Sequence, residues 1–461
     1  MTHVQILPAF DFETVDEKNQ KAQYNWGYDP DNYNVPEGSY AVSPYDGAVR
    51  IQEMKQMVLA LHSRGIGVIM DVVFNHTYRR DDSNLQKIVP GYYYRSDETG
   101  YTDGSGCGNE VASDRPMVQK LIVDSLIYWA KEYHIDGFRF DLMGVLDIDT
   151  MNVIAERLKE IRPDIYLYGE GWNGGPSSLA EEKRAFKASA KKMPGIGMFN
   201  DDIRDTIKGS VFYDDHLGFV NGGTHLENAL RYGITGAVAH PQVDYDAYGS
   251  KPWAKEPGQS INYVSCHDNY TLWDKLSVSC PEASEGKKKA MNRLCAAIVF
   301  TSQGVPFIQA GEEFLRSKPL PEKKGFAENS YNMPDEVNSI KWDNIHEYPD
   351  MIAYYKGLME LRKAHPVFRM QSEAEMTQNL CFLSDTPENV VAYLLKGKGA
   401  DDTPENILVI FNGNDEEILY NLPEGKWKIL VDDKTAGADG KKIISEKADV
   451  EPLSALVLEK E

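Results

Sequence analysis

The segment GVIMDVVFNH, residues 67–76, has the pattern of a buried parallel strand. As a strand it would be apolar on both faces before it ends in polar residues, which is typical of a parallel sheet that is covered on both sides. Six further short apolar runs have this form, and most are separated by amphipathic stretches of helical length. These runs span residues 3–10, 137–142, 165–169, 196–199, 261–266 and 305–310. The pattern predicts an α/β protein with a (β/α)8-type TIM barrel.

The pattern changes from Pro366 onward. Short alternating segments then follow one another, separated by Asp, Asn, Gly and Pro residues, as in an antiparallel β-sandwich. They span residues 390–395, 407–411, 427–431 and 455–458. We therefore predict two domains, a catalytic barrel over residues 1–365 and a C-terminal β-sandwich over residues 366–461.

Composition excludes several classes of protein. The 461 residues are 42% hydrophobic and 26% charged, which suits a globular core. A formal net charge of −22 argues against nucleic acid and anionic membranes as partners, and no apolar run reaches the roughly 18 residues of a membrane span. The five cysteines are scattered without a CxxC pair, so neither a disulfide framework nor a zinc site is expected. Unpaired cysteines and the lack of a signal peptide favour the cytoplasm.

Carboxylates stand at or near the ends of several predicted strands. They are Asp71, Asp141, Glu170 and Asp268. In a barrel of this type the reactive residues gather at the carboxyl ends of the strands. These four side chains are therefore the candidates for acid–base chemistry.

Strand alternation sorts these side chains, because residues two apart share a face. Arg139 lies on the same face as Asp141, and its fixed positive charge is expected to keep that carboxylate ionised. Tyr168 and Trp172 share a face with Glu170, and these aromatic walls are expected to keep it protonated. One ionised and one protonated carboxyl group are what glycoside hydrolysis uses.

Four segments resemble, in order, the signature regions of the α-amylase superfamily of glycoside hydrolases. They are residues 71–76, 137–144, 168–172 and 264–269. The segment YNWGYDP, residues 24–30, and Leu142-Met143-Gly144 resemble the type I pullulanases, the debranching branch of that superfamily. The likeness runs from His3 to about Leu361.

This resemblance implies a retaining hydrolase of α-1,6 branch linkages in pullulan, starch, glycogen or limit dextrins. It implies Asp141 as nucleophile, Glu170 as general acid/base and Asp268 as the carboxylate that stabilises the transition state. It also implies that Arg139, His76 and His267 surround the sugar at the cleavage point and that Tyr28 stacks on its ring.

Other substrate contacts are expected from position. Trp172 lies beside Glu170, while Asn332 and Asp335 follow the last barrel strand and are expected to contact sugars further along the glucan. Asp71 and Asn75 either contact the sugar or orient their neighbours. No organic cofactor is expected and no metal ligand is assigned, with calcium at Asp201-Asp202 or Asp214-Asp215-His216 as the alternative.

The strand count departs from the family pattern. Seven runs are found where a barrel needs eight strands, and residues 3–10 resemble the family's second strand. The first strand is therefore expected to be absent, which would leave unpaired strands at residues 3–10 and 305–310 and favour self-association. The alternatives are an isoamylase-like debranching enzyme, a branching transferase, or a truncated glucan-binding chain without activity.

Overall fold

The computed structural model describes residues 1–248, 251–321, 325–399, 404–440 and 442–461. They form two compact units. The first comprises residues 1–199 and 331–335, and the second comprises residues 200–330 and 336–461.

The first unit is built on five parallel strands in the order β1-β4-β7-β8-β9. Their bounds are β1 (His3–Ile6), β4 (Gly67–Val72), β7 (Gly137–Phe140), β8 (Tyr166–Gly169) and β9 (Ile196–Phe199). In the register of this sheet Asp71 of β4 lies opposite Arg139 of β7, which lies opposite Tyr168 of β8. Each of the five apolar runs between residues 3 and 199 thus contains one parallel strand of this sheet, although the run of residues 3–10 supplies only residues 3–6 to it.

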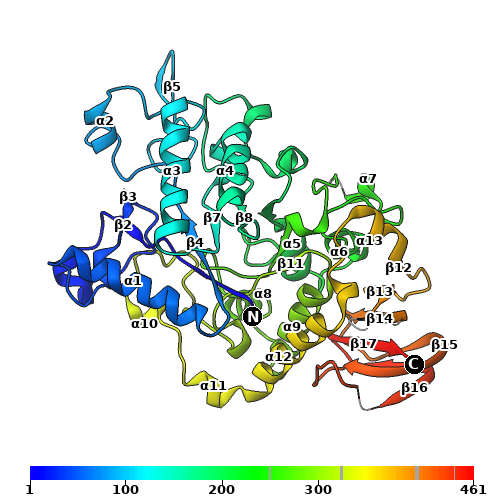
Figure 1. The fold of residues 1–461 in the computed structure, drawn as a ribbon. Coiled ribbons are helices and arrows are strands. Elements are labelled where there is room, and N and C mark those ends of the chain that lie inside the picture. The colour runs from blue at the N-terminus through cyan, green and yellow to red at the C-terminus, as the bar shows by residue number, and fades with distance from the viewer. Residues whose placement is uncertain (249–250, 322–324, 400–403, 441) are drawn as a thin grey trace. The chain divides into compact units, whose positions relative to one another are not determined.

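Helices separate these strands as predicted. α1 (Gly47–His62) begins at Asp46, whose side chain accepts from the Ala48 amide, and α4 (Ile148–Ile161) begins at Asp147, which accepts from the Thr150 amide. These are ordinary N-caps. α3 (Pro116–Glu132) starts on a proline and lies side by side with α4 (Figure 1). The smaller elements of the unit are η1 (Glu17–Ala22), η2 (Gly38–Tyr40), η3 (Met143–Val145), η4 (Glu181–Lys183), η5 (Lys187–Lys192), α2 (Asn84–Ile88), and the strand pairs β2 (Phe10–Phe12) with β3 (Pro30–Pro36) and β5 (Ser96–Asp97) with β6 (Gly100–Tyr101).

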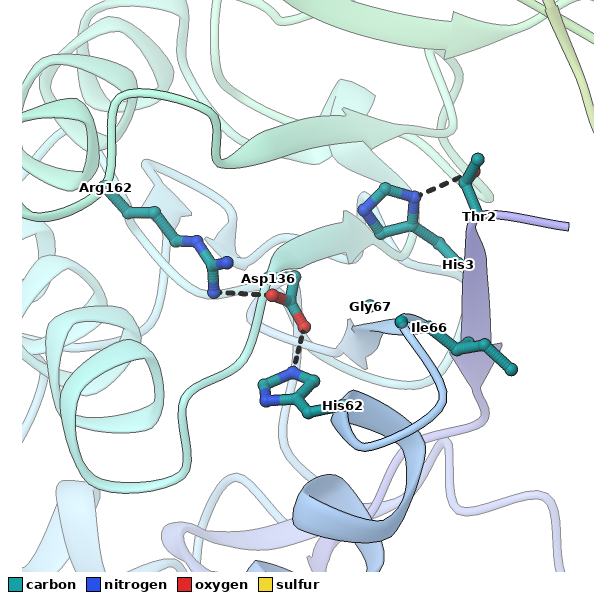
Figure 2. Close-up of a pocket in the computed structure, with 8 residues that line it drawn as sticks. Thr2, His3, His62, Ile66, Gly67, Asp136 and Arg162 are labelled. Atoms are coloured by element: carbon teal, nitrogen blue, oxygen red, sulfur yellow. Dashed lines mark hydrogen bonds and ion pairs between the residues drawn. The ribbon is translucent and has the colours of Figure 1, made fainter. Parts of the chain in front are cut away.

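Asp136 ties the helices to the amino end of this sheet (Figure 2). Its Oδ2 accepts from the Val68 amide at 2.6 Å and lies 2.7 Å from Nε2 of His62, the last residue of α1. Its Oδ1 lies 2.5 Å from Nη1 of Arg162, which follows α4. The Asp136 side chain is only 6% exposed. This cluster is therefore a structural anchor at the end of the strands opposite to the candidate site.

Replacing Asp136 by alanine is expected to lower the free energy of unfolding by about 2–4 kcal/mol, because the buried Val68 amide and the side chains of His62 and Arg162 lose the carboxylate that they share. Urea unfolding measures this change. Asp124→Ala, which removes an exposed ion pair with Lys120 on α3, should cost no more than about 0.5 kcal/mol. Equal losses in the two variants would contradict the anchoring role.

The second unit contains the remaining parallel strands and most of the helices. β10 (Ser260–Asn262) pairs in parallel with β11 (Val305–Pro306). α9 (Glu285–Thr301) packs against α12 (Pro349–Ala364), and its buried face runs from Met291 to Thr301. The other helices are α5 (Asp201–Lys208), α6 (Glu227–Ile234), α7 (Tyr245–Tyr248), α8 (Leu272–Ser279), α10 (Asp335–Asn338), α11 (Asn344–Glu347), α13 (Glu373–Asn379), η6 (Pro257–Gln259), η7 (Glu312–Phe314) and η8 (Pro366–Phe368).

The chain ends in a six-stranded antiparallel sheet of order β12-β13-β14-β17-β15-β16 (Figure 1). Its strands are β12 (Leu380–Phe382), β13 (Val390–Lys398), β14 (Pro404–Asn412), β15 (Ile418–Val431), β16 (Ile443–Val450) and β17 (Ser454–Lys460). One face buries a cluster centred on Trp427, with Leu408, Ile410, Tyr420 and Leu456 around it. β15 and β16 show the alternation of buried and exposed residues that is typical of a sheet with one solvated face. β13, β14 and β17 are instead buried on both faces over most of their length.

The predicted fold class, a barrel-type α/β region followed by antiparallel β structure, is confirmed. The division at residues 365 and 366 and the self-association through β1 and β11 stay predictions. No helix among the described residues combines the length and apolarity that crossing a membrane requires.

Candidate active site

Two candidate carboxylates follow adjacent parallel strands of the first unit. Asp141 comes directly after β7 and its amide donates to the Val72 carbonyl at 3.0 Å, while Glu170 comes directly after β8 and its amide donates to the Phe140 carbonyl at 3.1 Å. Each residue therefore continues the hydrogen-bonding pattern of its strand. The sheet fixes the backbone of both residues at its carboxyl end.

One guanidinium joins three carboxylates at this end. Nη1 of Arg139 lies 2.9 Å from Oδ1 of Asp71 and 2.9 Å from Oδ1 of Asp141, and Nη2 lies 2.5 Å from Oε1 of Glu170. All four residues are at least 91% buried. The alternation of side chains along a strand predicted the pairing of Arg139 with Asp141. The contacts with Asp71 and Glu170 go beyond it, and they show that Glu170 lies against a cation.

The backbone after Asp141 links the two carboxylates. Leu142 has φ 37° and ψ 51°, a left-handed conformation that is unusual for leucine. Its amide donates to Oε2 of Glu170 at 2.9 Å, and Asn75 donates through Nδ2 to Oδ2 and to the carbonyl oxygen of Asp141, both at 2.8 Å. The Asp141 side chain is thus held by Asn75 and Arg139. Asn75 therefore orients a neighbouring side chain, which was one of the two roles expected for it.

Asp71 is fully buried beneath this cluster. Its Oδ2 accepts from the hydroxyl of Tyr28 at 2.7 Å and from Nε2 of Gln5 at 3.3 Å. Burial raises the pKa of Asp71 from 3.8 to about 7, against the opposing effect of the Arg139 charge. With no exposed surface, Asp71 orients Arg139 and Tyr28. Its direct contact with a sugar stays a prediction.

The raised pKa gives Asp71 a predictable effect on stability. Between about pH 4 and pH 7 the folded state binds more protons at Asp71 than the unfolded state does, so this residue's contribution to the free energy of unfolding falls as pH rises. We expect Asp71→Asn to lack this contribution, so that the parent loses stability relative to the variant between pH 4.5 and pH 7. Urea unfolding at both pH values measures the difference, and a constant difference would contradict the raised pKa.

Other predicted substrate-binding residues lie around this cluster or elsewhere in the first unit. His76 is buried, with Nδ1 at 2.5 Å from Oδ1 of Asn75 and Nε2 at 3.0 Å from the carbonyl oxygen of Tyr28, and burial lowers the pKa of its imidazole. Trp172 is half-buried and its carbonyl accepts from the Gly144 amide. Asn332 and Asp335 are exposed, in the segment 331–335.

His267 and Asp268 belong to the second unit, after β10. Nε2 of His267 lies 3.5 Å from Oδ2 of Asp268. The His267 side chain is 15% exposed and that of Asp268 is 45% exposed. Asp268 is thus an accessible carboxylate, unlike the buried three that surround Arg139.

Sequence reasoning missed a polar relay below the cluster. The hydroxyl of Tyr168 donates to Oε1 of Gln5 at 2.5 Å, and Gln5 in turn donates to Asp71. The signal was present, because Gln5 is a polar residue inside the otherwise apolar run of residues 3–10. Buried polar groups need partners, so such a residue indicates a polar group on a neighbouring strand.

Comparisons with known proteins bear on this arrangement. A family model described as the all-beta domain of pullulanase matches residues 377–435. A pullulanase of Bacillus subtilis (strain 168) is 42% identical over 434 residues, which cover 94% of this chain and 58% of the relative. The solved structure of Paenibacillus barengoltzii pullulanase, in complex with maltohexaose and alpha-cyclodextrin, is 43% identical with a TM-score of 0.90, and the match covers 100% of this chain and 69% of that chain. This chain belongs to the type I pullulanase family.

A further pullulanase structure, from Bacillus acidopullulyticus, matches with a TM-score of 0.92 and 43% identity over 100% of this chain and 54% of that chain. The family resemblance that the motifs indicated is thereby confirmed. The chain spans a little over half the length of the B. subtilis and B. acidopullulyticus pullulanases.

Proposed function

We propose that this pullulanase-family chain is a retaining glycoside hydrolase that cleaves α-1,6 branch linkages in pullulan, starch, glycogen or limit dextrins. The observation that carries the proposal is the guanidinium of Arg139 between Asp141 and Glu170, at the carboxyl ends of adjacent parallel strands. This brings two carboxyl groups to one site, as glycoside hydrolysis requires. Family membership adds the α-1,6 preference, which the residues alone do not specify.

In the proposed reaction Glu170 protonates the glycosidic oxygen while Asp141 attacks the anomeric carbon. Water, deprotonated by the same Glu170, then releases the sugar with its configuration retained. Asp268 is the third carboxylate and stabilises the positive charge that develops on the sugar ring. This scheme needs no organic cofactor, and it predicts a separation of roughly 5 to 5.5 Å between the carboxyl groups of Asp141 and Glu170.

The contacts of each carboxylate fix its orientation. Arg139 and Asn75 hold Asp141 in one orientation, so little freedom is lost when it attacks. Arg139 and the Leu142 amide hold Glu170.

An α-glucan is the proposed substrate class. The solved structure of the P. barengoltzii relative contains maltohexaose and alpha-cyclodextrin, which supports binding of malto-oligosaccharides here. Tyr28, His76, Trp172 and His267 are the proposed contacts at the cleaved linkage, and the exposed Asn332 and Asp335 are the proposed contacts further along the glucan.

Incubation with pullulan tests the proposed reaction. We expect maltotriose as the product, with an equal gain in reducing ends, because each α-1,6 linkage is hydrolysed. Transfer of branches without a gain in reducing ends would support the branching transferase instead. Glucan binding without turnover above that of Asp141→Asn would support the inactive binding protein.

We also infer a cytoplasmic location. None of the five cysteines forms a disulfide bond, as is usual in a reducing compartment. Fractionation of cells that produce the protein tests this, and recovery of the protein from the medium would contradict it.

A further inference from the structure

A buried lysine supports the turn that carries Asp268. Lys318 is 1% exposed. Its Nζ donates to the carbonyl oxygens of Asn269 at 2.8 Å and His267 at 3.3 Å, and it lies 3.5 Å from the carbonyl oxygen of Glu328. The first two carbonyls stand on either side of Asp268. One ammonium group therefore joins the two ends of the short turn from which the Asp268 side chain projects.

Hydrogen bonds from Lys318 help to hold the backbone of this turn. Asn269 has φ 58°, in the left-handed region, which asparagine adopts more readily than most residues other than glycine but still at a small cost. Without the ammonium group the two carbonyls on either side of Asp268 would lose a shared, charge-assisted donor.

Lys318 is itself held in place from α8. Asp274, in the first turn of that helix, is 0% exposed, and its carboxylate accepts from the Lys318 amide at 2.8 Å and from the Ser317 hydroxyl at 2.5 Å. The Asp274 amide is capped by the Thr271 hydroxyl at 3.2 Å. A continuous set of hydrogen bonds thus runs from the start of α8 through Asp274 and Lys318 to the Asp268 turn.

The charges around Lys318 are few. Burial lowers the pKa of its ammonium group from 10.5 to about 8, and the negative charge of Asp274 opposes this shift. Arg316 lowers the pKa further, while Cys266 and Asp268 raise it. Burying a charged group is costly unless it is well hydrogen-bonded, and the backbone carbonyls supply those bonds.

We propose that Lys318 is a positioning residue for Asp268. The ammonium group of Lys318 fixes the turn of residues 267–269 and so sets where the accessible carboxylate of Asp268 points. This inference rests on the proposed function, in which Asp268 stabilises the transition state. Misplacing a catalytic group by about 1 Å can lower a rate about a hundredfold. We therefore expect Lys318→Met to lower kcat on pullulan by about ten- to a hundredfold, with a smaller change in KM.

Lys275 offers a matched control. It is also 1% exposed and its Nζ also donates to two backbone carbonyls, those of Tyr213 at 2.6 Å and Asp214 at 3.2 Å. Lys275→Met removes the same kind of buried cation without touching the 267–269 turn. The two variants should lose similar amounts of thermal stability, but only Lys318→Met should lower kcat by about tenfold or more. Equal kcat in the two variants, each corrected for the folded fraction, would overturn the proposal.

A double-mutant cycle separates positioning of Asp268 from any other effect of Lys318. If Lys318 acts through Asp268, Lys318→Met should lower kcat by less than about threefold in an Asp268→Asn background, because the positioned group is already gone. The same fold loss in both backgrounds would overturn the proposal.

Hydrogen exchange of the peptide that covers residues 265–272 gives a readout independent of activity. We expect exchange of this peptide to be at least about tenfold faster in Lys318→Met and unchanged in Lys275→Met, because only the first loosens the turn. Unchanged exchange in Lys318→Met would contradict the positioning role. If the parent protein hydrolyses no glucan, the proposed function fails, while this exchange experiment still decides whether Lys318 fixes the turn.

Lys318→Arg serves if the methionine variant does not fold. Arginine stays charged at alkaline pH. Because the pKa of Lys318 is about 8, the parent's protection against hydrogen exchange at residues 265–272, corrected for the intrinsic pH dependence of exchange, should fall above that pH. In Lys318→Arg this fall should move to higher pH, and an unmoved fall in a folded Lys318→Arg enzyme would overturn the proposal.

Discussion

Asp141→Asn is expected to lower kcat on pullulan by at least about a thousandfold, because an amide cannot form the covalent glycosyl–enzyme bond that a carboxylate forms. The variant should remain folded, since asparagine has nearly the same volume and keeps an oxygen that can accept from Arg139. Reducing-end assays on pullulan, combined with thermal unfolding, measure both effects.

Asp124→Asn provides the control for this experiment. Asp124 is exposed on α3, where it pairs with Lys120, and its replacement should leave kcat within about twofold of the parent. An Asp141→Asn enzyme that keeps a tenth or more of the parent activity would exclude Asp141 as the nucleophile.

Arg139→Met is expected to have the largest combined effect on stability and activity. It removes the only guanidinium that contacts Asp71, Asp141 and Glu170 among the described residues, and it leaves three buried carboxylates without their shared cation. Breaking a buried ion pair in this way costs about 3–5 kcal/mol of the free energy of unfolding. Urea unfolding near neutral pH measures the loss, and turnover on pullulan should fall with it.

Two further variants define what Arg139 contributes. Arg139→Lys keeps the charge but not the planar fork that reaches separate carboxylates, so it should recover part of the stability while kcat stays at least about tenfold low. Arg157→Met, which removes an exposed pair with Glu160 on α4, should cost less than about 0.5 kcal/mol. If Arg139→Met were as stable as Arg157→Met, this result would contradict the role of Arg139 as the cation that three buried carboxylates share.

Most of the fold was predictable from apolar runs, and the errors have local causes. The run of residues 3–10 was predicted as one strand, but the structure divides it into β1 and β2. Pro8 lies between them and has no amide hydrogen to donate to a neighbouring strand. In the run of residues 261–266 strand pairing ends at Asn262, although Tyr263 and Val264 beyond it are also buried. Apolar residues thus predicted burial correctly and strand length less well.

The candidate site was predictable where it depends on alternation along one strand. Arg139 and Asp141 were placed together because they are two residues apart along β7 and its direct continuation. The contacts of Arg139 with Asp71 and Glu170 depend instead on the register between β4, β7 and β8, which no pattern within one strand specifies.

Two other features gave no sequence signal. The left-handed backbone of Leu142 is unexpected, because leucine does not favour that conformation. The burial of Lys318 is equally unexpected in the polar stretch Arg316–Lys318, since lysine is almost always exposed. Both depend on contacts with residues that are distant along the chain.

Trapping the covalent intermediate tests directly whether Asp141 is the nucleophile. A fluorinated malto-oligosaccharyl fluoride forms the glycosyl–enzyme faster than water can release it, so the intermediate accumulates on the nucleophile. Mass spectrometry of proteolytic peptides should then find the added sugar on the peptide that contains Asp141, and none on that peptide in Asp141→Asn. A sugar attached to a different carboxylate, or an active enzyme that forms no adduct, would contradict a retaining mechanism with Asp141 as the nucleophile.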